Sequence, residues 1–187
     1  MGLSVRSTSI LAGVASALFV LLLFSAASPP NASARSLVAP AKVCKNVSGN
    51  AANGKAIGSM LCFTNYARAK KGLKKYRSVG KLKFAARKKA ADILRCDEFS
   101  HEACRREFTY WMERSGYSGC RLGENIAFGT GGLGSSRKIF KAWMKSPGHR
   151  RNILSRDFRD IGIGLRTGHM EGISGAHIWV QNFGTRC

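Results

Sequence analysis

The fold of this chain is indicated most clearly by one stretch, Ser146-Pro147-Gly148-His149-Arg150-Arg151-Asn152-Ile153-Leu154. Apolar residues within 139–143 predict a helix just before it, and Pro147 ends that helix because a proline ring cannot continue it. Starting at His149, residues spaced i, i+3 and i+4 predict a further helical turn. The stretch therefore predicts a helix, a proline boundary and a turn that carries His149.

Three more helices are predicted upstream of this stretch. Apolar residues recur at helical spacing within 57–67, 82–93 and 108–115. Gly72 follows the first of these segments and Gly116 follows the third, and glycine commonly ends a helix. The N-terminal half of the domain is therefore predicted to be mainly helical.

Strands are predicted mainly in the C-terminal half. The glycine-bounded segment 123–129 is typical of a strand, and 131–136 is predicted to be a flexible loop. Two further β-like segments, 161–167 and 176–183, flank the turn-prone residues 168–175. Helices that come first and strands that cluster late predict an α+β fold with an antiparallel sheet.

Four segments in this order resemble the signature of a known family. They are Phe99-Ser100-His101, Gly123-Glu124-Asn125-Ile126, the stretch 146–154 and Trp179-Val180-Gln181-Asn182-Phe183-Gly184, with Ile161-Gly162-Ile163-Gly164 between the last two. Together they resemble the CAP superfamily, the SCP-like extracellular proteins of the cysteine-rich secretory and pathogenesis-related type, in its bacterial style. The resemblance covers about 57–187 and implies an α-β-α sandwich with a central antiparallel sheet.

The same resemblance implies a central cleft that usually presents two histidines and two glutamates. His101, Glu124 and His149 match three of those positions. The fourth position, three residues after Trp143, is Ser146 in this chain. We therefore expect a binding cleft formed by His101, Glu124, Ser146 and His149, with one carboxylate fewer than the family pattern.

The chemistry of these residues leaves several functions open. Imidazole and carboxylate groups are common zinc ligands, so His101, His149 and Glu124 are candidates for a weakly bound divalent metal such as zinc. The alternative is a structural hydrogen-bonded cluster. We expect a non-catalytic extracellular binding domain, with a metal-assisted or Ser/His hydrolase acting on an extracellular substrate as the alternative. No catalytic residue is identified, because Ser146 lacks the features of a nucleophile elbow.

The N-terminal residues predict a targeting segment. Arg6 precedes an apolar run over 10–24, and Ala32-Ser33-Ala34 fits a signal-peptidase site. The alternative is a membrane anchor, but the run is short for a spanning helix of about 20 residues. The chain is therefore predicted to be secreted and to have no transmembrane span after cleavage. The predicted organisation is a signal peptide over 1–34, an N-terminal arm over 35–56 and a CAP domain over 57–187.

Six cysteines in an exported chain predict three disulfides. Spacing alone does not choose among the many connectivities. Their places relative to the predicted elements favour Cys44–Cys62, Cys96–Cys104 and Cys120–Cys187, while Cys104–Cys120 competes with the last two. A Cys96–Cys104 bond would hold the loop that carries His101.

The net charge of +21 is the most extreme property of the composition. Twelve Lys and Arg lie within 68–95, and six more lie within 137–151. Such charge attracts polyanions, although a solvated surface is the alternative. We expect an anionic cell-wall polymer or an anionic lipid surface as partner. Specific nucleic-acid binding is not expected, because aromatic residues are not interleaved with the basic ones.

Overall fold

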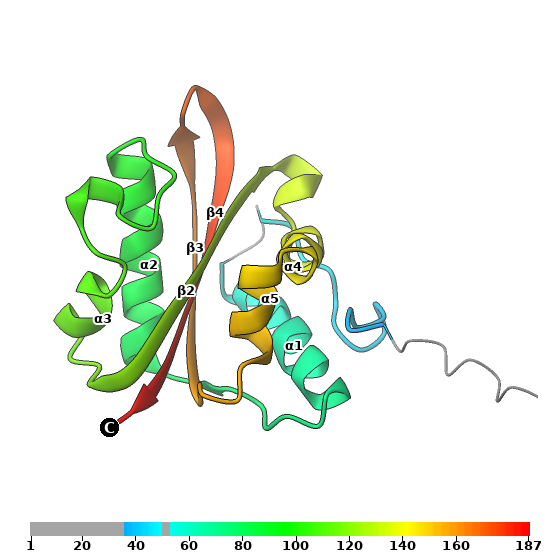
Figure 1. Ribbon diagram of the computed structural model, residues 1–187. Helices are drawn as coiled ribbons and strands as arrows, with labels where there is room; N and C mark the ends of the chain where they lie inside the picture. Colours follow the sequence, from blue (N-terminus) through cyan, green and yellow to red (C-terminus); the bar gives the residue numbers. More distant parts are fainter. Residues whose placement is uncertain (1–35, 50–52) are drawn as a thin grey trace, which may run out of the picture. The chain divides into compact units, whose positions relative to one another are not determined.

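The computed structural model describes residues 36–49 and 53–187, so the predicted signal peptide lies outside the described residues. The helices and strands follow one another as shown in Figure 1. They are α1 (Asn53–Lys70), β1 (Arg77–Ser78), α2 (Gly80–Arg95), η1 (Ala103–Arg105), α3 (Tyr110–Arg114), β2 (Gly119–Thr130), η2 (Gly131–Gly134), α4 (Ser136–Lys145), α5 (Pro147–Leu154), β3 (Asp160–Met170) and β4 (Ile173–Arg186).

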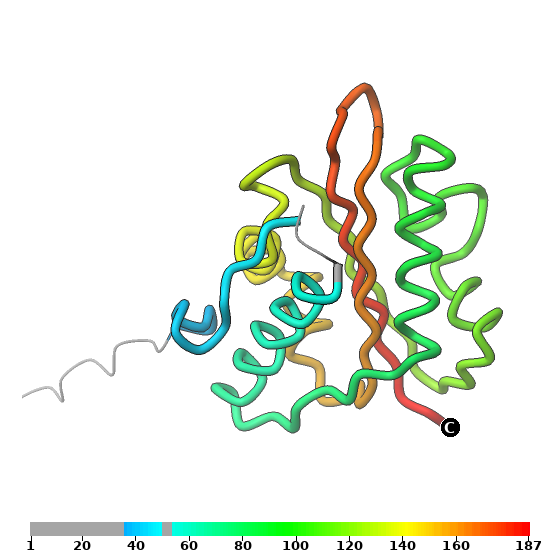
Figure 2. Tube along the Cα trace, turned by 180° about the vertical axis from the view of Figure 1, so that it is seen from behind, coloured from blue at the N-terminus to red at the C-terminus, as the bar shows by residue number. Residues whose placement is uncertain are grey.

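The sheet has the strand order β1-β3-β4-β2. Strand β4 pairs antiparallel with both β3 and β2, which confirms the predicted antiparallel centre. The short β1 was not predicted, and it pairs parallel with β3 at Arg77 and Ser78. Helices α1, α4 and α5 cover one face of the sheet and α2 and α3 cover the other (Figures 1 and 2). The predicted α-β-α sandwich is confirmed.

The two faces of β3 differ in side-chain size, and this difference brings α2 close to the sheet. Ile161 and Ile163 are buried in the core shared with α1, α4 and α5. The alternating residues Gly162 and Gly164 face α2, because successive residues of a strand point to opposite faces. A Cβ atom added at Gly164 would stand 2.4 Å from a backbone carbon of Ala86. The backbone of α2 therefore packs directly on the strand.

Several element boundaries differ from those predicted. Pro147 begins α5 as well as ending the helix before it. The N–H groups in the first turn of a helix have no acceptor within the helix, so proline, which lacks an N–H, is tolerated there. Strand β2 (Gly119–Thr130) begins four residues before the predicted 123–129 and ends one residue after it. The predicted loop over 131–136 contains the 3-10 turn η2, at Gly131–Gly134, and its last residue, Ser136, begins α4.

Three disulfides cross-link the domain. Cys44–Cys62 fastens the N-terminal arm to α1, and Cys96–Cys104 closes a short loop after α2. Cys120–Cys187 joins the start of β2 to the residue that follows β4. These are the pairings that the sequence favoured, and the competing Cys104–Cys120 bond is not formed.

Candidate functional site

A hollow of about 420 Å³ lies where three separate segments meet at the β2 edge of the sheet. The segment after α2 lines one side, α5 lines another and the edge strand β2 lies between them. We call this hollow the histidine cleft; its lining residues are Phe99, Ser100, His101, Glu102, Ile126 and His149. The fold therefore brings the two predicted cleft histidines to one surface.

His101 is held by a buried carboxylate. Its Nδ1 lies 2.8 Å from Oε1 of Glu124. The Glu124 side chain is 1% exposed, whereas the His101 side chain is 50% exposed. Because an ionised carboxylate only accepts hydrogen bonds, the ring proton belongs on Nδ1 in this arrangement. Nε2 of His101 is then the nitrogen left to interact with a ligand.

Protein donors surround the Glu124 carboxylate. Burial raises the pKa of Glu124, while the hydrogen bond from His101 and the positive charge of Lys89 oppose that rise. The amide of Asn182, oriented with its nitrogen toward the carboxylate, donates to Oε2 at 3.1 Å. Lys89 is itself buried and donates to the backbone carbonyl of His101. Burial lowers the pKa of this lysine, and the charge of Glu124 opposes the change.

His149 contributes the second imidazole, from the first turn of α5. Its ring centre lies 6.4 Å from that of the buried Trp143. Burial lowers the pKa of His149 below its ordinary value, and the nearby His101 lowers it further. His149 is therefore a neutral imidazole at neutral pH, able to donate from one ring nitrogen and accept at the other.

A network of side-chain amides, of which Asn125 and Gln181 are buried, fixes α5 to the edge strand. Nδ2 of Asn125 donates to the backbone carbonyl of His149 and to Oε1 of Gln181, both at 3.1 Å. Nδ2 of Asn152 donates to the backbone carbonyl of Glu124 at 3.1 Å and to Oδ1 of Asn125 at 2.9 Å. The sequence motifs did not predict a role for these amides. Polar residues inside otherwise buried segments were the signal that could have revealed them.

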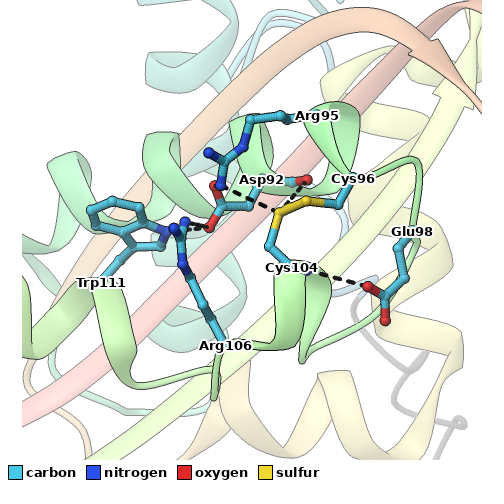
Figure 3. The surroundings of a disulfide bond; sticks show 7 residues. All are labelled: Asp92, Arg95, Cys96, Glu98, Cys104, Arg106 and Trp111. Atoms are coloured by element: carbon cyan, nitrogen blue, oxygen red, sulfur yellow. Dashed lines mark hydrogen bonds and ion pairs between the residues drawn. A yellow bond between two sulfur atoms is a disulfide. The ribbon is translucent and has the colours of Figure 1, made fainter.

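The loop that carries His101 is anchored on the other side by Asp92. This residue of α2 is 3% exposed and accepts hydrogen bonds from Arg106 and from Nε1 of Trp111, both at 2.6 Å. Figure 3 shows these side chains beside the Cys96–Cys104 disulfide. A covalent bond and a charged hydrogen-bond cluster therefore hold the two ends of this loop.

The predicted ligands His101, His149 and Glu124 are not gathered into a ligand set in the described part of the chain. Within 36–49 and 53–187, no group of three or more His, Cys, Asp or Glu side chains is arranged to hold a metal ion. Both oxygens of Glu124 already accept from His101 and Asn182. Ser146 lies at the junction of α4 and α5, outside the residues that line the cleft. These contacts fit a hydrogen-bonding site better than a ligand set.

The two Ser/His pairs considered from the sequence are not in hydrogen-bond contact among the described residues. Ser100 is the single hydroxyl side chain among the lining residues, and its Oγ accepts from the backbone N–H of Glu102 at 2.9 Å. Neither Ser100 with His101 nor Ser146 with His149 forms a hydrogen bond among the described residues. A Ser/His hydrolase requires such a contact between nucleophile and base.

Comparison with known proteins agrees with this fold. The model of the CAP family, described as the cysteine-rich secretory protein family, matches residues 61–183, and the chain belongs to this family. It is 35% identical over 122 residues to the uncharacterized protein YkwD of Bacillus subtilis. That match covers 65% of this chain and 44% of YkwD, so the chain corresponds to less than half of the relative.

Solved structures show the same architecture at low identity. An extracellular SCP-domain protein from Bacillus anthracis aligns with a TM-score of 0.59 and 21% identity, over 72% of this chain and 41% of that one. An outer surface protein of Borrelia burgdorferi aligns with a TM-score of 0.62 and 17% identity, over 76% of this chain and 98% of that one. Across 36–49 and 53–187, this chain has no helix with the length and hydropathy needed to span a bilayer.

Proposed function

We propose that this chain is an exported, non-catalytic binding domain whose histidine cleft takes a hydroxyl-bearing ligand of the cell surface. The observation that carries this proposal is the 2.8 Å contact between Nδ1 of His101 and the buried Glu124. It fixes the ring and leaves Nε2 as an acceptor on a half-exposed side chain. A hydroxyl group is a suitable donor to that nitrogen.

The other residues that line the cleft fit a ligand that has both polar and apolar surface. His149 offers a neutral imidazole, because burial lowers its pKa. Phe99 and Ile126 add apolar surface to the same wall. A sugar presents hydroxyl groups at its edges and C–H groups on its faces. A glycan of the cell wall therefore matches the chemistry of the cleft.

The experiment is a titration of the protein with soluble wall-glycan oligosaccharides, followed by ¹H–¹⁵N NMR. We expect shift changes at His101, His149 and Ile126. His101→Ala should weaken binding at least tenfold, whereas the exposed His169→Ala should bind as the wild type does. Glycan binding that persists in His101→Ala, or no shift at the cleft, would overturn the proposal.

Two further measurements separate binding from the enzymatic alternatives. Mass spectrometry of the oligosaccharide after long incubation should recover it intact, and cleavage by wild type but not by His101→Ala would establish a hydrolase. Zinc calorimetry should show affinity of roughly micromolar or weaker, since both Glu124 oxygens have protein donors. Tight zinc binding that His101→Ala abolishes would support the metal-assisted alternative, and Ser146→Glu would test the missing carboxylate.

We further propose that the chain is secreted, that 1–34 is removed, and that its positive charge keeps it near an anionic cell-wall polymer. The three disulfides and the charge of +21 support this assignment. N-terminal sequencing of the exported protein should begin at Arg35. A full-length form extracted from the membrane would contradict it.

A further inference from the structure

We propose a second binding site, separate from the histidine cleft, that takes the phosphodiester groups of an anionic cell-wall polymer. It is a hollow of about 660 Å³ beside α5. We call it the arginine hollow. Its charged lining residues are Lys145, Arg150, Arg151, Arg156 and Asp157. The assignment rests on the proposed attraction to wall polymers and adds to it a place and a ligand chemistry.

The cations of the arginine hollow are exposed and lack counter-charges. Among the described residues, the side chains of Lys145, Arg150, Arg151 and Arg156 have no hydrogen-bond or ion-pair partner. The one acid in the lining, Asp157, instead forms an ion pair with Arg121 at 3.2 Å. Four neighbouring positive charges, beside one acid that is paired with Arg121, repel one another, and an anion in the hollow would relieve that repulsion.

The backbone beneath these cations is firmly held. The buried Arg68 donates from one guanidinium nitrogen to the carbonyls of Ile153 at 2.9 Å and Ser155 at 2.8 Å. The Tyr76 hydroxyl donates to the carbonyl of Asn152 at 2.6 Å. The last turn of α5 and the start of the following loop are therefore fixed from below. A site on such a backbone needs little reordering when a ligand binds.

The cations come from three different segments of the chain, and this arrangement favours phosphate over carboxylate as the ligand group. Lys145 ends α4, Arg150 and Arg151 lie in α5, and Arg156 lies in the loop after it. Cations from three segments can approach a tetrahedral phosphate from different directions, while a planar carboxylate accepts within one plane. Arginine also forms paired hydrogen bonds to phosphate oxygens.

The shape and lining of the hollow favour a flexible polymer over other polyanions. A flat bilayer would not reach into a concave surface. Among the described residues that line the hollow, none is aromatic, so it offers no platform on which bases could stack. A chain of polyol phosphates is narrow, flexible and charged at each repeat, and it can place one phosphate in the hollow while its neighbours contact the surrounding surface.

The test compares two triple variants that each remove three positive charges. The first is Arg150→Gln/Arg151→Gln/Arg156→Gln in the hollow. The control is Lys83→Gln/Arg87→Gln/Arg166→Gln, which changes exposed cations of α2 and β3 without side-chain partners among the described residues. The probe is a synthetic glycerol-phosphate oligomer, with affinity measured by fluorescence anisotropy at several salt concentrations. Circular dichroism confirms that both variants fold.

We expect the hollow variant to lose at least tenfold in affinity and its salt slope to fall by about two to three, since each lost phosphate contact lowers the slope by about one. The control should lose much less. Equal losses would overturn the site and leave the general attraction to polyanions standing. Failure of the wild type to bind would overturn the polymer attraction proposed above, and with it this site.

Three further probes test the identity of the ligand. Polygalacturonate that binds as tightly as the glycerol-phosphate oligomer would refute the phosphate assignment. Anionic vesicles or duplex DNA that bind more tightly would refute the polymer assignment. His101→Ala should bind the glycerol-phosphate oligomer as the wild type does, because the two hollows share no lining residue. A loss in that variant would show that the two sites are one.

Discussion

Glu124 and His149 both lie in surroundings that disfavour charge, and their effects on stability oppose each other in acid. Burial raises the pKa of Glu124 from 4.5, so the folded state takes up this proton at higher pH than the unfolded state. Burial lowers the pKa of His149 from 6.5, so the folded state resists a proton that the unfolded state accepts. As pH falls, Glu124 therefore favours folding while His149 opposes it.

These opposite signs lead to a prediction for His149→Gln. In the wild type, the contribution of neutral His149 to the free energy of unfolding is present above pH 6.5, and it is lost as pH falls from there toward the lowered pKa. The variant should therefore lose less stability than the wild type between about pH 7 and pH 5. Urea denaturation at both pH values measures this difference. The exposed His169→Gln should lose as much as the wild type, and a matching loss in His149→Gln would refute the explanation.

Of the four residues that the sequence singled out for the cleft, His101 and His149 are among those that line it, while Glu124 and Ser146 are not. His101, Glu124 and His149 stood out because three motif segments carry them. The contact of Asn182 with Glu124 depends on the pairing of β2 with β4, which places these two residues opposite each other. No local sequence pattern predicts the register of β2 against β4. The sequence therefore could not decide whether Glu124 is a metal ligand or a hydrogen-bond partner.

Among the elements, α2 and β3 make the tightest backbone contact described, and a single methyl group should disrupt it. In Gly164→Ala, the new Cβ would lie 2.4 Å from a backbone carbon of Ala86, so the helix must move. We expect a loss of about 3 kcal/mol in the free energy of unfolding, at the upper end of ordinary overpacking. Urea denaturation measures it.

Gly58→Ala is the matched control for this substitution. Gly58 lies inside α1 and an added Cβ there has no neighbour within 4 Å. Alanine is favoured over glycine in a helix by about 1 kcal/mol, so this variant should be slightly more stable than the wild type. If Gly164→Ala were as stable as the wild type, the inferred close packing of α2 on the sheet would be wrong.

The elements also show where sequence patterns stop being informative. Apolar spacing located α1, α2 and α4 because each buries one face, and the long strands were located from a glycine-bounded segment and two β-like runs beside a turn-prone stretch. Strand β1 has only two exposed residues, Arg77 and Ser78, so it lacks any such pattern. It forms because β3 offers an edge beside it. Pro147 was ambiguous for a similar reason, because a proline can either end one helix or begin the next.

Across the whole molecule, the disulfides should contribute unequally to stability. In the chain-entropy model, the stabilisation grows with the length of the closed loop. The sequence separation is 67 for Cys120–Cys187 and 8 for Cys96–Cys104. We therefore expect Cys120→Ala/Cys187→Ala to lose about 4 kcal/mol and Cys96→Ala/Cys104→Ala about 2.5 kcal/mol. Thermal and urea denaturation of the two variants test this order, and a larger loss in the second would contradict it.

The distribution of charge is a property of the whole domain that sequence order conceals. The basic run within 68–95 dominates the sequence, yet α2 carries much of it on the sheet face opposite α5. The smaller group within 137–151 was less conspicuous, but α4, α5 and the loop after them gather three of its cations with Arg156 into one hollow. The density of positive charge along the sequence therefore did not predict where positive charge is densest in the folded domain.

The Cys120–Cys187 bond also decides how the domain would respond to mechanical tension. The residues between these two cysteines include α4, α5, β3 and β4, and the bond prevents the segment they form from being drawn out. At about 3.4 Å for each extended residue, a separation of 67 residues corresponds to roughly 230 Å of chain that cannot lengthen. Tension applied across the domain would therefore leave this segment inside a covalently closed ring, and the arginine hollow, whose lining residues all lie within 145–157, would stay with it.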